Sequence, residues 1–403
     1  MLLHVSTPSS LLLIALMFVL YTGFILFVAH HVRSLFARTG SPERAMYRYN
    51  MLSKFGTSIL MFVVVLGTTI LIMPHLKIWM KGLGEAGQAA AVIVPFLSVI
   101  LLTVINQLIA YPVVKEIRGT TDTQKEQMGT LFKFLGIILG PMLVFFLLLN
   151  FLPASWEHKL FSGQYAGILL PLLFIVAVSL LSPVLMKRAL KAKPMEDGEL
   201  KKGLEQFARQ AGLGSIRLYV WPATKNKTAN AMVYGLRRKS IMMSDYLIQN
   251  CTPEQIQAIL AHEIGHAKRY HLWIRLLLIL LWVPTVMGVA QLGDRYAPEA
   301  PTWVQITTMV GLLLIYFGFT LRYVYRVQER QADAYVIKLG LQPHVFISAL
   351  FKLAKLNMMV MKFNKVDEKL QTHPSFARRI RWLADQAGIS DDELAVIQEE
   401  SVR

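Results

Sequence analysis

The sequence predicts a mainly α-helical, multi-pass membrane protein that also contains one small α+β segment. Two observations predict this class: a strongly apolar composition, and seven long apolar segments separated by polar connections. Of the 403 residues, 54% are hydrophobic and 17% are charged, whereas a soluble chain carries about 25% charged residues. This composition excludes a disordered, collagen-like or disulfide-rich chain, and it argues against an ordinary soluble enzyme.

Seven segments are long and apolar enough to cross a bilayer, which takes about 20 mostly apolar residues. They are residues 11–29, 57–73, 89–114, 131–152, 166–185, 272–292 and 306–324. The first segment has no cleavage signal and no basic flank, so we expect it to be retained as a span. Asn106 and Gln107 lie in the third segment, and we expect their side chains to form hydrogen bonds with neighbouring helices. The alternative is that they line a water-filled cavity.

The charge of the connections predicts the orientation in the membrane. The connections after the first, third and fifth spans hold 5, 3 and 15 Lys and Arg residues, whereas the other three hold 2, 1 and 1. Lys and Arg gather on the cytoplasmic side, so we expect the N-terminus outside and the C-terminus in the cytoplasm. The same rule accounts for the net charge of +17. The lipid bilayer is therefore the expected partner of the basic residues, and nucleic acid is not, because no basic stripe is interleaved with aromatics.

The alternation of apolar and polar stretches divides the chain into four expected regions. Residues 1–186 form a five-span transmembrane region, and residues 187–271 form a cytoplasmic segment. Residues 272–324 hold spans six and seven, and residues 325–403 form a cytoplasmic tail with helices. The single cysteine, Cys251, excludes an internal disulfide.

The cytoplasmic segment combines helical and strand patterns. Apolar residues at helical spacing predict a helix over residues 199–211, which Gly212 ends. Short β-rich runs follow at residues 216–221, 231–234 and 240–244. Residues 235–238 can turn the last two runs into a hairpin, so we expect a small sheet.

A second helix of this segment begins near Thr252. Thr252 can cap the helix, Pro253 suits its first position, and Gln255 can complete a capping box. We expect the helix to run through His271 towards the sixth span.

Two histidines and a glutamate on this helix form a metal-binding pattern. His262 and His266 are four residues apart and therefore lie on one helical face, where both imidazoles can reach one ion. Glu263, one position further round, can reach a water on that ion. This His-Glu-x-x-His arrangement is typical of zinc peptidases. The alternative is a pair of solvated histidines on a helix surface.

A catalytic zinc needs a third protein ligand and one open position. Glu329 and Asp333 follow the seventh span, on the same predicted membrane face as the histidines, and are also four residues apart. We expect Glu329 to be the third ligand and Asp333 to orient a ligating histidine; a solvated helix face is the alternative. The residues alone favour packing at the membrane border for His271 and leave the role of His373 open.

Several strings of this sequence resemble the type I CAAX prenyl proteases, which are integral-membrane zinc metalloendopeptidases. The strings are Ala229-Asn230-Ala231-Met232-Val233-Tyr234-Gly235, the run Ile241–Leu247, His262–His266 and Glu329–Tyr335. The seven-span layout extends the resemblance over the whole chain. The resemblance implies that the spans wall a large water-filled chamber and that the peptidase site faces it.

The resemblance assigns roles around a metal ion. It implies one Zn²⁺ per chain, bound by His262, His266 and Glu329. It also implies that Glu263 is the catalytic base and that Asp333 is a supporting acid in catalysis.

The resemblance assigns further roles around the substrate. The strand at Asn230 and Ala231 is implied to pair with the substrate backbone. His373 and Arg379 match the family's His-Pro-x-x-x-x-Arg element, which lies near the bound peptide. We therefore expect His373 to act in catalysis as a donor to the oxyanion, and Arg379 to bind substrate.

These expectations converge on a membrane-embedded zinc metalloendopeptidase that hydrolyses peptide bonds at the cytoplasmic membrane face. Its substrate would be a peptide or membrane protein, with or without a prenyl group. One alternative is an HtpX-like quality-control protease, a family with two spans before its peptidase segment instead of five. A non-catalytic, zinc-stabilised membrane scaffold is the other, but a structural site does not need Glu263. The lack of an obvious dilysine signal and the single cysteine suggest a bacterial member in the plasma membrane.

Overall fold

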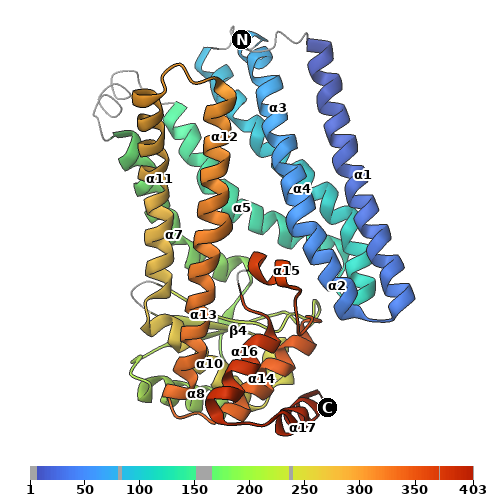
Figure 1. Ribbon diagram of the computed structural model, residues 1–403, viewed down its shortest axis with the longest axis vertical. Coiled ribbons are helices and arrows are strands. Elements are labelled where there is room, and N and C mark those ends of the chain that lie inside the picture. Colours follow the sequence, from blue (N-terminus) through green and yellow to red (C-terminus); the bar gives the residue numbers. More distant parts are fainter. Residues whose placement is uncertain (1–6, 80–83, 151–165, 236–238, 372, 403) are drawn as a thin grey trace. The chain divides into compact units, whose positions relative to one another are not determined.

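The computed structural model describes residues 7–79, 84–150, 166–235, 239–371 and 373–402 (Figure 1). Its internal contacts divide the chain into two compact units, Met1–Ala166 and Gly167–Arg403. The four-region division expected from the sequence stays a prediction.

The first unit is built from long helices. These are α1 (Thr7–Thr39), α2 (Pro42–Met51), the π-helical segment η1 (Leu52–Thr57), α3 (Ser58–Trp79), α4 (Gly84–Arg118) and α5 (Gln124–Asn150). Helices α1, α3 and α4 pack around the buried side chains of Tyr21, Ile25, Val64 and Leu102. The Tyr21 hydroxyl donates a hydrogen bond to the Leu102 carbonyl over 3.2 Å. This bond satisfies a buried polar atom that would otherwise destabilise the apolar core.

The second unit combines one sheet with the remaining helices. The helices are α7 (Ala166–Ala189), α8 (Glu199–Gln210), α9 (Asp245–Asn250), α10 (Pro253–Lys268), α11 (His271–Tyr296), α12 (Thr302–Leu313), the π-helical segment η3 (Leu314–Thr320), α13 (Leu321–Lys338), α14 (Pro343–Leu356), α15 (Lys365–Leu370), α16 (Phe376–Ala387) and α17 (Asp391–Val402). Helices α8, α10, α14 and α16 share one hydrophobic core with the sheet.

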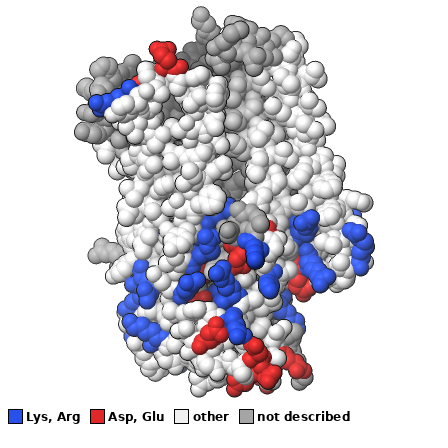
Figure 2. Space-filling view, in the orientation of Figure 1, with Lys and Arg blue, Asp and Glu red and all other residues white. Residues whose placement is uncertain are grey.

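Seven helices among the described residues are long and apolar enough to cross a membrane. They are Thr7–Thr39, Pro42–Met73, Ile93–Arg118, Gln124–Leu149, Leu169–Ala189, His271–Tyr296 and Thr302–Lys338. The seven predicted spans are thus confirmed as helices of spanning length, although residues 151 and 152 of the fourth lie outside the described residues. In the second unit, Figure 2 shows an uncharged band over α11 and α12 with charged residues at either end. The orientation across the membrane stays a prediction.

The sheet has four strands, β1 (Lys193–Pro194), β2 (Arg217–Trp221), β3 (Ala231–Tyr234) and β4 (Ser240–Ser244), in the order β1-β2-β4-β3. β2 and β4 are parallel, and the outer pairs are antiparallel. All five residues of β4 are buried, which explains its unbroken apolar run. The predicted β3–β4 hairpin is confirmed, while residues 236–238 of its turn lie outside the described residues. β3 therefore forms one edge of the sheet.

The predicted start of α10 is confirmed, but its predicted continuation through His271 is wrong. Thr252 and Gln255 form a capping box, with Pro253 in the first turn. The helix ends at Lys268, and Tyr270 adopts a left-handed conformation with φ of 56° before α11 begins at His271. A left-handed residue ends a helix because it redirects the chain. Glycine usually takes this role, so a tyrosine gives no sequence signal of the break.

Candidate active site

Helices α10 and α13 cross closely within the second unit, and this crossing assembles the candidate site. Helix α10 carries the His-Glu-x-x-His motif, and α13 carries Glu329. A Cβ atom added to Gly265 would lie 3.0 Å from Tyr335 Cβ and 3.1 Å from Ala332 Cα. Carbon atoms in contact normally stay about 3.5–4.0 Å apart. The close approach of the two helices therefore favours glycine at this position, because any larger residue would push the neighbouring atoms of α13 away.

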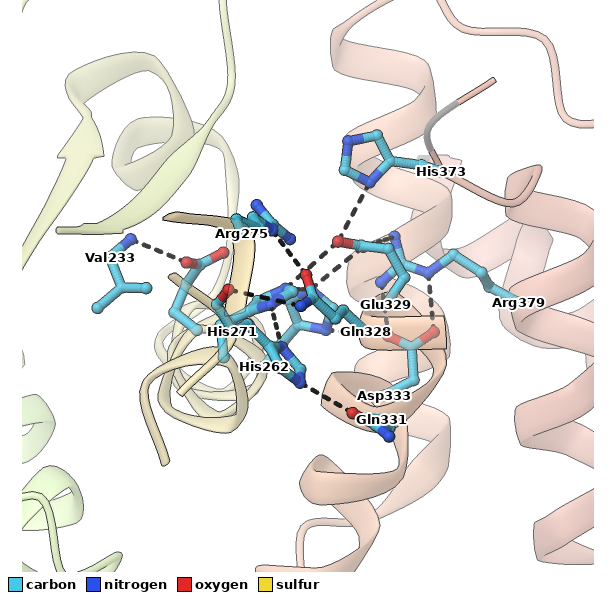
Figure 3. Close-up of polar contacts among 12 residues, drawn as sticks. Val233, His262, His271, Arg275, Gln328, Glu329, Gln331, Asp333, His373 and Arg379 are labelled. Atoms are coloured by element: carbon cyan, nitrogen blue, oxygen red, sulfur yellow. Dashed lines mark hydrogen bonds and ion pairs between the residues drawn. The ribbon is translucent and has the colours of Figure 1, made fainter. Parts of the chain in front are cut away.

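Three side chains at the crossing, those of His262, His266 and Glu329, form a compact triangle of donor atoms. His262 and Glu329 are labelled in Figure 3. The Nε2 atoms of His262 and His266 lie 3.1 Å apart. Nε2 of His262 lies 3.6 Å from Oε2 of Glu329, and Nε2 of His266 lies 3.4 Å from Oε1. A tetrahedral zinc with bonds of about 2.0–2.1 Å spaces its ligand atoms about 3.3 Å apart. The two nitrogens and the Glu329 carboxylate are thus spaced closely enough to bind one zinc ion, with a position left for water or substrate.

The protonation of the two histidines also suits a cation. Burial lowers the pKa of His266 to about 4, so this imidazole is neutral at neutral pH, as a metal ligand must be. Burial also acts to lower the pKa of His262, but hydrogen bonds to Asp333 and Glu329 outweigh it and raise that pKa to about 9. The acidic groups around His262 therefore favour positive charge, which a metal ion can supply in place of a proton.

Asp333 lies beneath the triangle and contacts His262 from the side away from Glu329. Its Oδ1 atom is 2.9 Å from His262 Nδ1, and its side chain is buried. A proton on Nδ1 facing this carboxylate leaves Nε2 with the lone pair that a metal needs. Arg379 holds Asp333 with two bonds, Nε to Oδ2 at 2.9 Å and Nη2 to Oδ1 at 2.6 Å. The structure thus brings Asp333 to His262, and the orienting role that the sequence predicts for Asp333 stays a prediction.

His266 has its own supporting chain, which the sequence interpretation missed. Nδ1 of His266 lies 2.8 Å from Nδ1 of His271, and Nε2 of His271 lies 2.9 Å from Oε1 of Gln331. Because the Gln331 oxygen can only accept, His271 donates from Nε2 and accepts at Nδ1. His266 then donates from Nδ1 and keeps its Nε2 lone pair for a metal. The break at Tyr270 makes this contact available by starting α11 at His271.

Glu263 lies beside the donor triangle and contacts the sheet edge. Its Oε2 atom accepts a hydrogen bond from the Val233 N–H over 2.9 Å (Figure 3). Burial raises the pKa of Glu263 to about 7. A carboxylate with a pKa near the working pH is suited to general base catalysis. Glu263 thus lies between strand β3 and the candidate metal position.

The remaining predicted residues approach the site from the end of the chain and from the strand. His373 has an exposed side chain, and its Nδ1 atom lies 3.2 Å from Glu329 Oε1. Arg379 is nearly buried, with only 12% of its side chain exposed, and its guanidinium group contacts Asp333. Ala231 lies on edge strand β3, and Asn230 directly precedes it. The roles of these four residues towards a substrate stay predictions.

The arrangement as a whole combines four chemical elements. It offers three metal donors, an adjacent carboxylate of raised pKa, a strand edge for an extended chain, and an exposed imidazole. Such a set can polarise a carbonyl group, deprotonate a water and hold an extended main chain in register.

Comparison with known proteins agrees with this geometry. Residues 194–387 match peptidase family M48. The chain is similar to the CAAX prenyl protease 1 homolog of Arabidopsis thaliana, with 29% identity over 271 residues that cover 62% of this chain and 61% of that protein. It is also similar to CAAX prenyl protease 1 of Saccharomyces cerevisiae, with 25% identity over 246 residues and 54% of each chain covered.

Two further similarities bear on the fold and on the alternative function. Protease HtpX of Legionella pneumophila is 23% identical over 230 residues, which cover 53% of this chain and 79% of that protein. A crystal structure of Ste24p from S. mikatae has a TM-score of 0.63 and 20% identity, with 92% of this chain and 98% of that chain covered. The matched part of the chain spans between about half and three-fifths of the two prenyl proteases, whereas the likeness of fold extends over nearly the whole chain.

Proposed function

We propose that the chain is a membrane-embedded zinc metalloendopeptidase of the CAAX prenyl protease 1 type, and the match of residues 194–387 to peptidase family M48 supports this proposal. The observation that carries the proposal is the donor triangle of His262, His266 and Glu329 with Glu263 beside it. A non-catalytic scaffold has no use for a carboxylate of raised pKa next to its metal. The metal is proposed to be one Zn²⁺ per chain.

The chain's own residues account for the steps of peptide hydrolysis. Zinc, when bound, lowers the pKa of water and polarises the scissile carbonyl. Glu263 takes the proton of the attacking water and later donates it to the leaving amine. His373, whose Nδ1 atom lies 3.2 Å from Glu329 Oε1, is the proposed donor to the oxyanion that develops on the carbonyl. Asp333 and Arg379 hold His262 in the tautomer that the reaction needs.

The proposed substrate is an extended segment of a peptide or membrane protein. Its main chain adds to the edge of β3 at Ala231, because main-chain hydrogen bonds recognise any sequence that can extend. A prenyl group would gain about 0.8 kcal/mol per buried CH₂ from apolar spans. We therefore propose that lipidation lowers KM and leaves kcat nearly unchanged.

The location follows from the charge asymmetry of the connections. We propose a multi-pass protein of a bacterial plasma membrane, with the N-terminus outside and both the peptidase segment and the C-terminus in the cytoplasm. An impermeant thiol reagent applied to sealed vesicles should label a cysteine at Gly198 only from the cytoplasmic side and one at Ala297 only from outside. Equal labelling of both sites would contradict this orientation.

An HtpX-like quality-control protease is the second candidate, because the similarity to HtpX covers 79% of that protein. The fold favours the first candidate, since seven candidate spans are present and the likeness to Ste24p extends over 92% of the chain. The two candidates differ in substrate, and matched peptides with and without a farnesyl cysteine distinguish them. A lower KM for the farnesylated peptide favours the prenyl protease, whereas equal KM values favour the quality-control protease.

Metal removal tests the proposed function directly. A strong chelator should abolish hydrolysis of a quenched fluorescent peptide by the purified chain, and about one equivalent of Zn²⁺ should restore it. His262→Ala serves as the control, because it should not regain activity at that zinc concentration. Hydrolysis that persists when no metal is detected would contradict the proposal.

A further inference from the structure

Strand β3 presents one long edge that no other strand covers in the part of the chain that the structure describes. Its other edge pairs with β4, with Ala231 opposite Met243. The Asn230 carbonyl accepts from the Ser244 N–H over 2.9 Å, so the main-chain groups of Asn230 face β4. Main-chain groups alternate in direction along a strand. Those of residues 229, 231 and 233 therefore face the uncovered edge.

Two of these three residues already have partners for their outward groups. The Val233 N–H donates to Glu263. At the other end, the side chain of Asn357 pairs with both groups of Ala229: the Ala229 N–H donates to Oδ1 over 3.1 Å, and Nδ2 donates to the Ala229 carbonyl over 2.8 Å. The amide side chain thus occupies the place where a paired peptide strand would continue. Ala231 remains between the two ends with its outward N–H and carbonyl.

Asn357 is held firmly in this position. It follows α14 directly, and its main-chain N–H donates to the Leu353 carbonyl over 3.1 Å. Its side-chain Nδ2 also donates to the same carbonyl over 3.0 Å. The clamp on Ala229 therefore comes from a side chain that is anchored to the end of a helix in the hydrophobic core.

We propose that Asn357 is a positioning residue that ends the substrate-binding edge of β3 at Ala229. The inference rests on the proposed function and makes it more specific. A bound peptide pairs with both groups of Ala231 and with the Val233 carbonyl, and it cannot extend its pairing to Ala229. Residues of the peptide that lie beyond Ala231 in this direction therefore gain no main-chain pairing with the strand. The paired stretch is thereby confined to the part of β3 that lies next to Glu263.

The dependence of affinity on peptide length tests this role, because a merely structural role would not change it. Peptides lengthened on either side are titrated onto zinc-loaded Glu263→Gln. On the side that runs past Ala231 towards Ala229, affinity should stop rising beyond the residue opposite Ala231. When Asn357→Ala is added to this protein, one more residue on that side should raise affinity about fivefold, since one more residue pair can bond. Asn357→Asp keeps the acceptor for the Ala229 N–H but loses the donor, and should give a smaller gain.

A control variant and the series without Asn357→Ala decide the remaining outcomes. Met359→Ala changes an exposed residue of the same loop and should leave the length dependence of affinity unchanged. An equal length dependence with and without Asn357→Ala would overturn the proposal. If the Asn357→Ala protein does not fold, the series on Glu263→Gln alone still decides, because a steady gain in affinity on both sides would overturn the proposal. Failure of the wild type to cut any peptide would count against the proposed function, while this binding series still tests the clamp.

Discussion

Replacing Gly265 with alanine is the perturbation whose size the structure defines most closely. The new Cβ atom would lie 3.0 Å from Tyr335 Cβ and 3.1 Å from Ala332 Cα. Contacts this short require the neighbouring atoms of α13 to shift by a few tenths of an ångström. Zinc sites tolerate deviations of about 0.2 Å in ligand distances, so Glu329 would leave its ligand position. We expect zinc affinity to fall at least about tenfold, a loss typical of disturbed support around a metal site.

The stability of Gly265→Ala should change less than its metal affinity. Alanine favours a helix interior over glycine by about 1 kcal/mol, whereas overpacking a core costs about 1–3 kcal/mol. The net loss of unfolding free energy is therefore about 0–2 kcal/mol. Zinc affinity is measured on the detergent-solubilised protein by competition with a chelator. The unfolding free energy is measured on the same preparation.

A matched control separates the crossing from helix propensity. Gly203 lies within α8, and no other atom lies within 4 Å of a Cβ added there. Gly203→Ala should stabilise the protein by up to about 1 kcal/mol and leave zinc affinity unchanged. Wild-type zinc affinity in Gly265→Ala would refute the conclusion that this close crossing positions Glu329.

Three further outcomes are expected. His271→Ala should lower zinc affinity about 10–100-fold by releasing the tautomer of His266, while His344→Ala, an exposed control, should not; equal zinc affinities would contradict the relay. Arg379→Gln should cost about 3–5 kcal/mol of unfolding free energy because the buried carboxylate of Asp333 loses its charged partner. Arg378→Gln changes an exposed neighbour as the control, and equal unfolding free energies for the two variants would refute this. Protonation removes the base as the pH falls through the pKa of Glu263, raised to about 7 by burial. A bound cation lowers that pKa, so kcat/KM should decline with a midpoint at or below pH 7, and a profile flat to about pH 4 would exclude Glu263 as the base.

Patterns that depend on local spacing were predictable from the sequence. The apolar length of each span, the capping box at Thr252 and the two pairs of residues four apart all follow from helix geometry and composition. The hairpin of β3 and β4 follows from short β-rich runs around a turn. These features need no knowledge of tertiary contacts, and the structure agrees with them.

Features that depend on tertiary contacts were not predictable in the same way. The left-handed Tyr270 carries no glycine or proline signal, so the break that brings His271 back to His266 was missed. Asn357 lies 128 residues from Ala229 in the sequence, and nothing in its surroundings indicates pairing with a strand edge. The partnership of Arg379 with Asp333 likewise arises from folding, because each residue alone resembles part of a solvated helix face.

Replacing Glu263 with glutamine tests the central claim most directly. The amide retains the size of the side chain and can still accept from the Val233 N–H, but it cannot take a proton from water. The purified Glu263→Gln protein is measured for zinc content and for cleavage of a reporter peptide in one preparation. The account predicts about one zinc per chain with hydrolysis lost, whereas cleavage at the wild-type rate with zinc bound would contradict it.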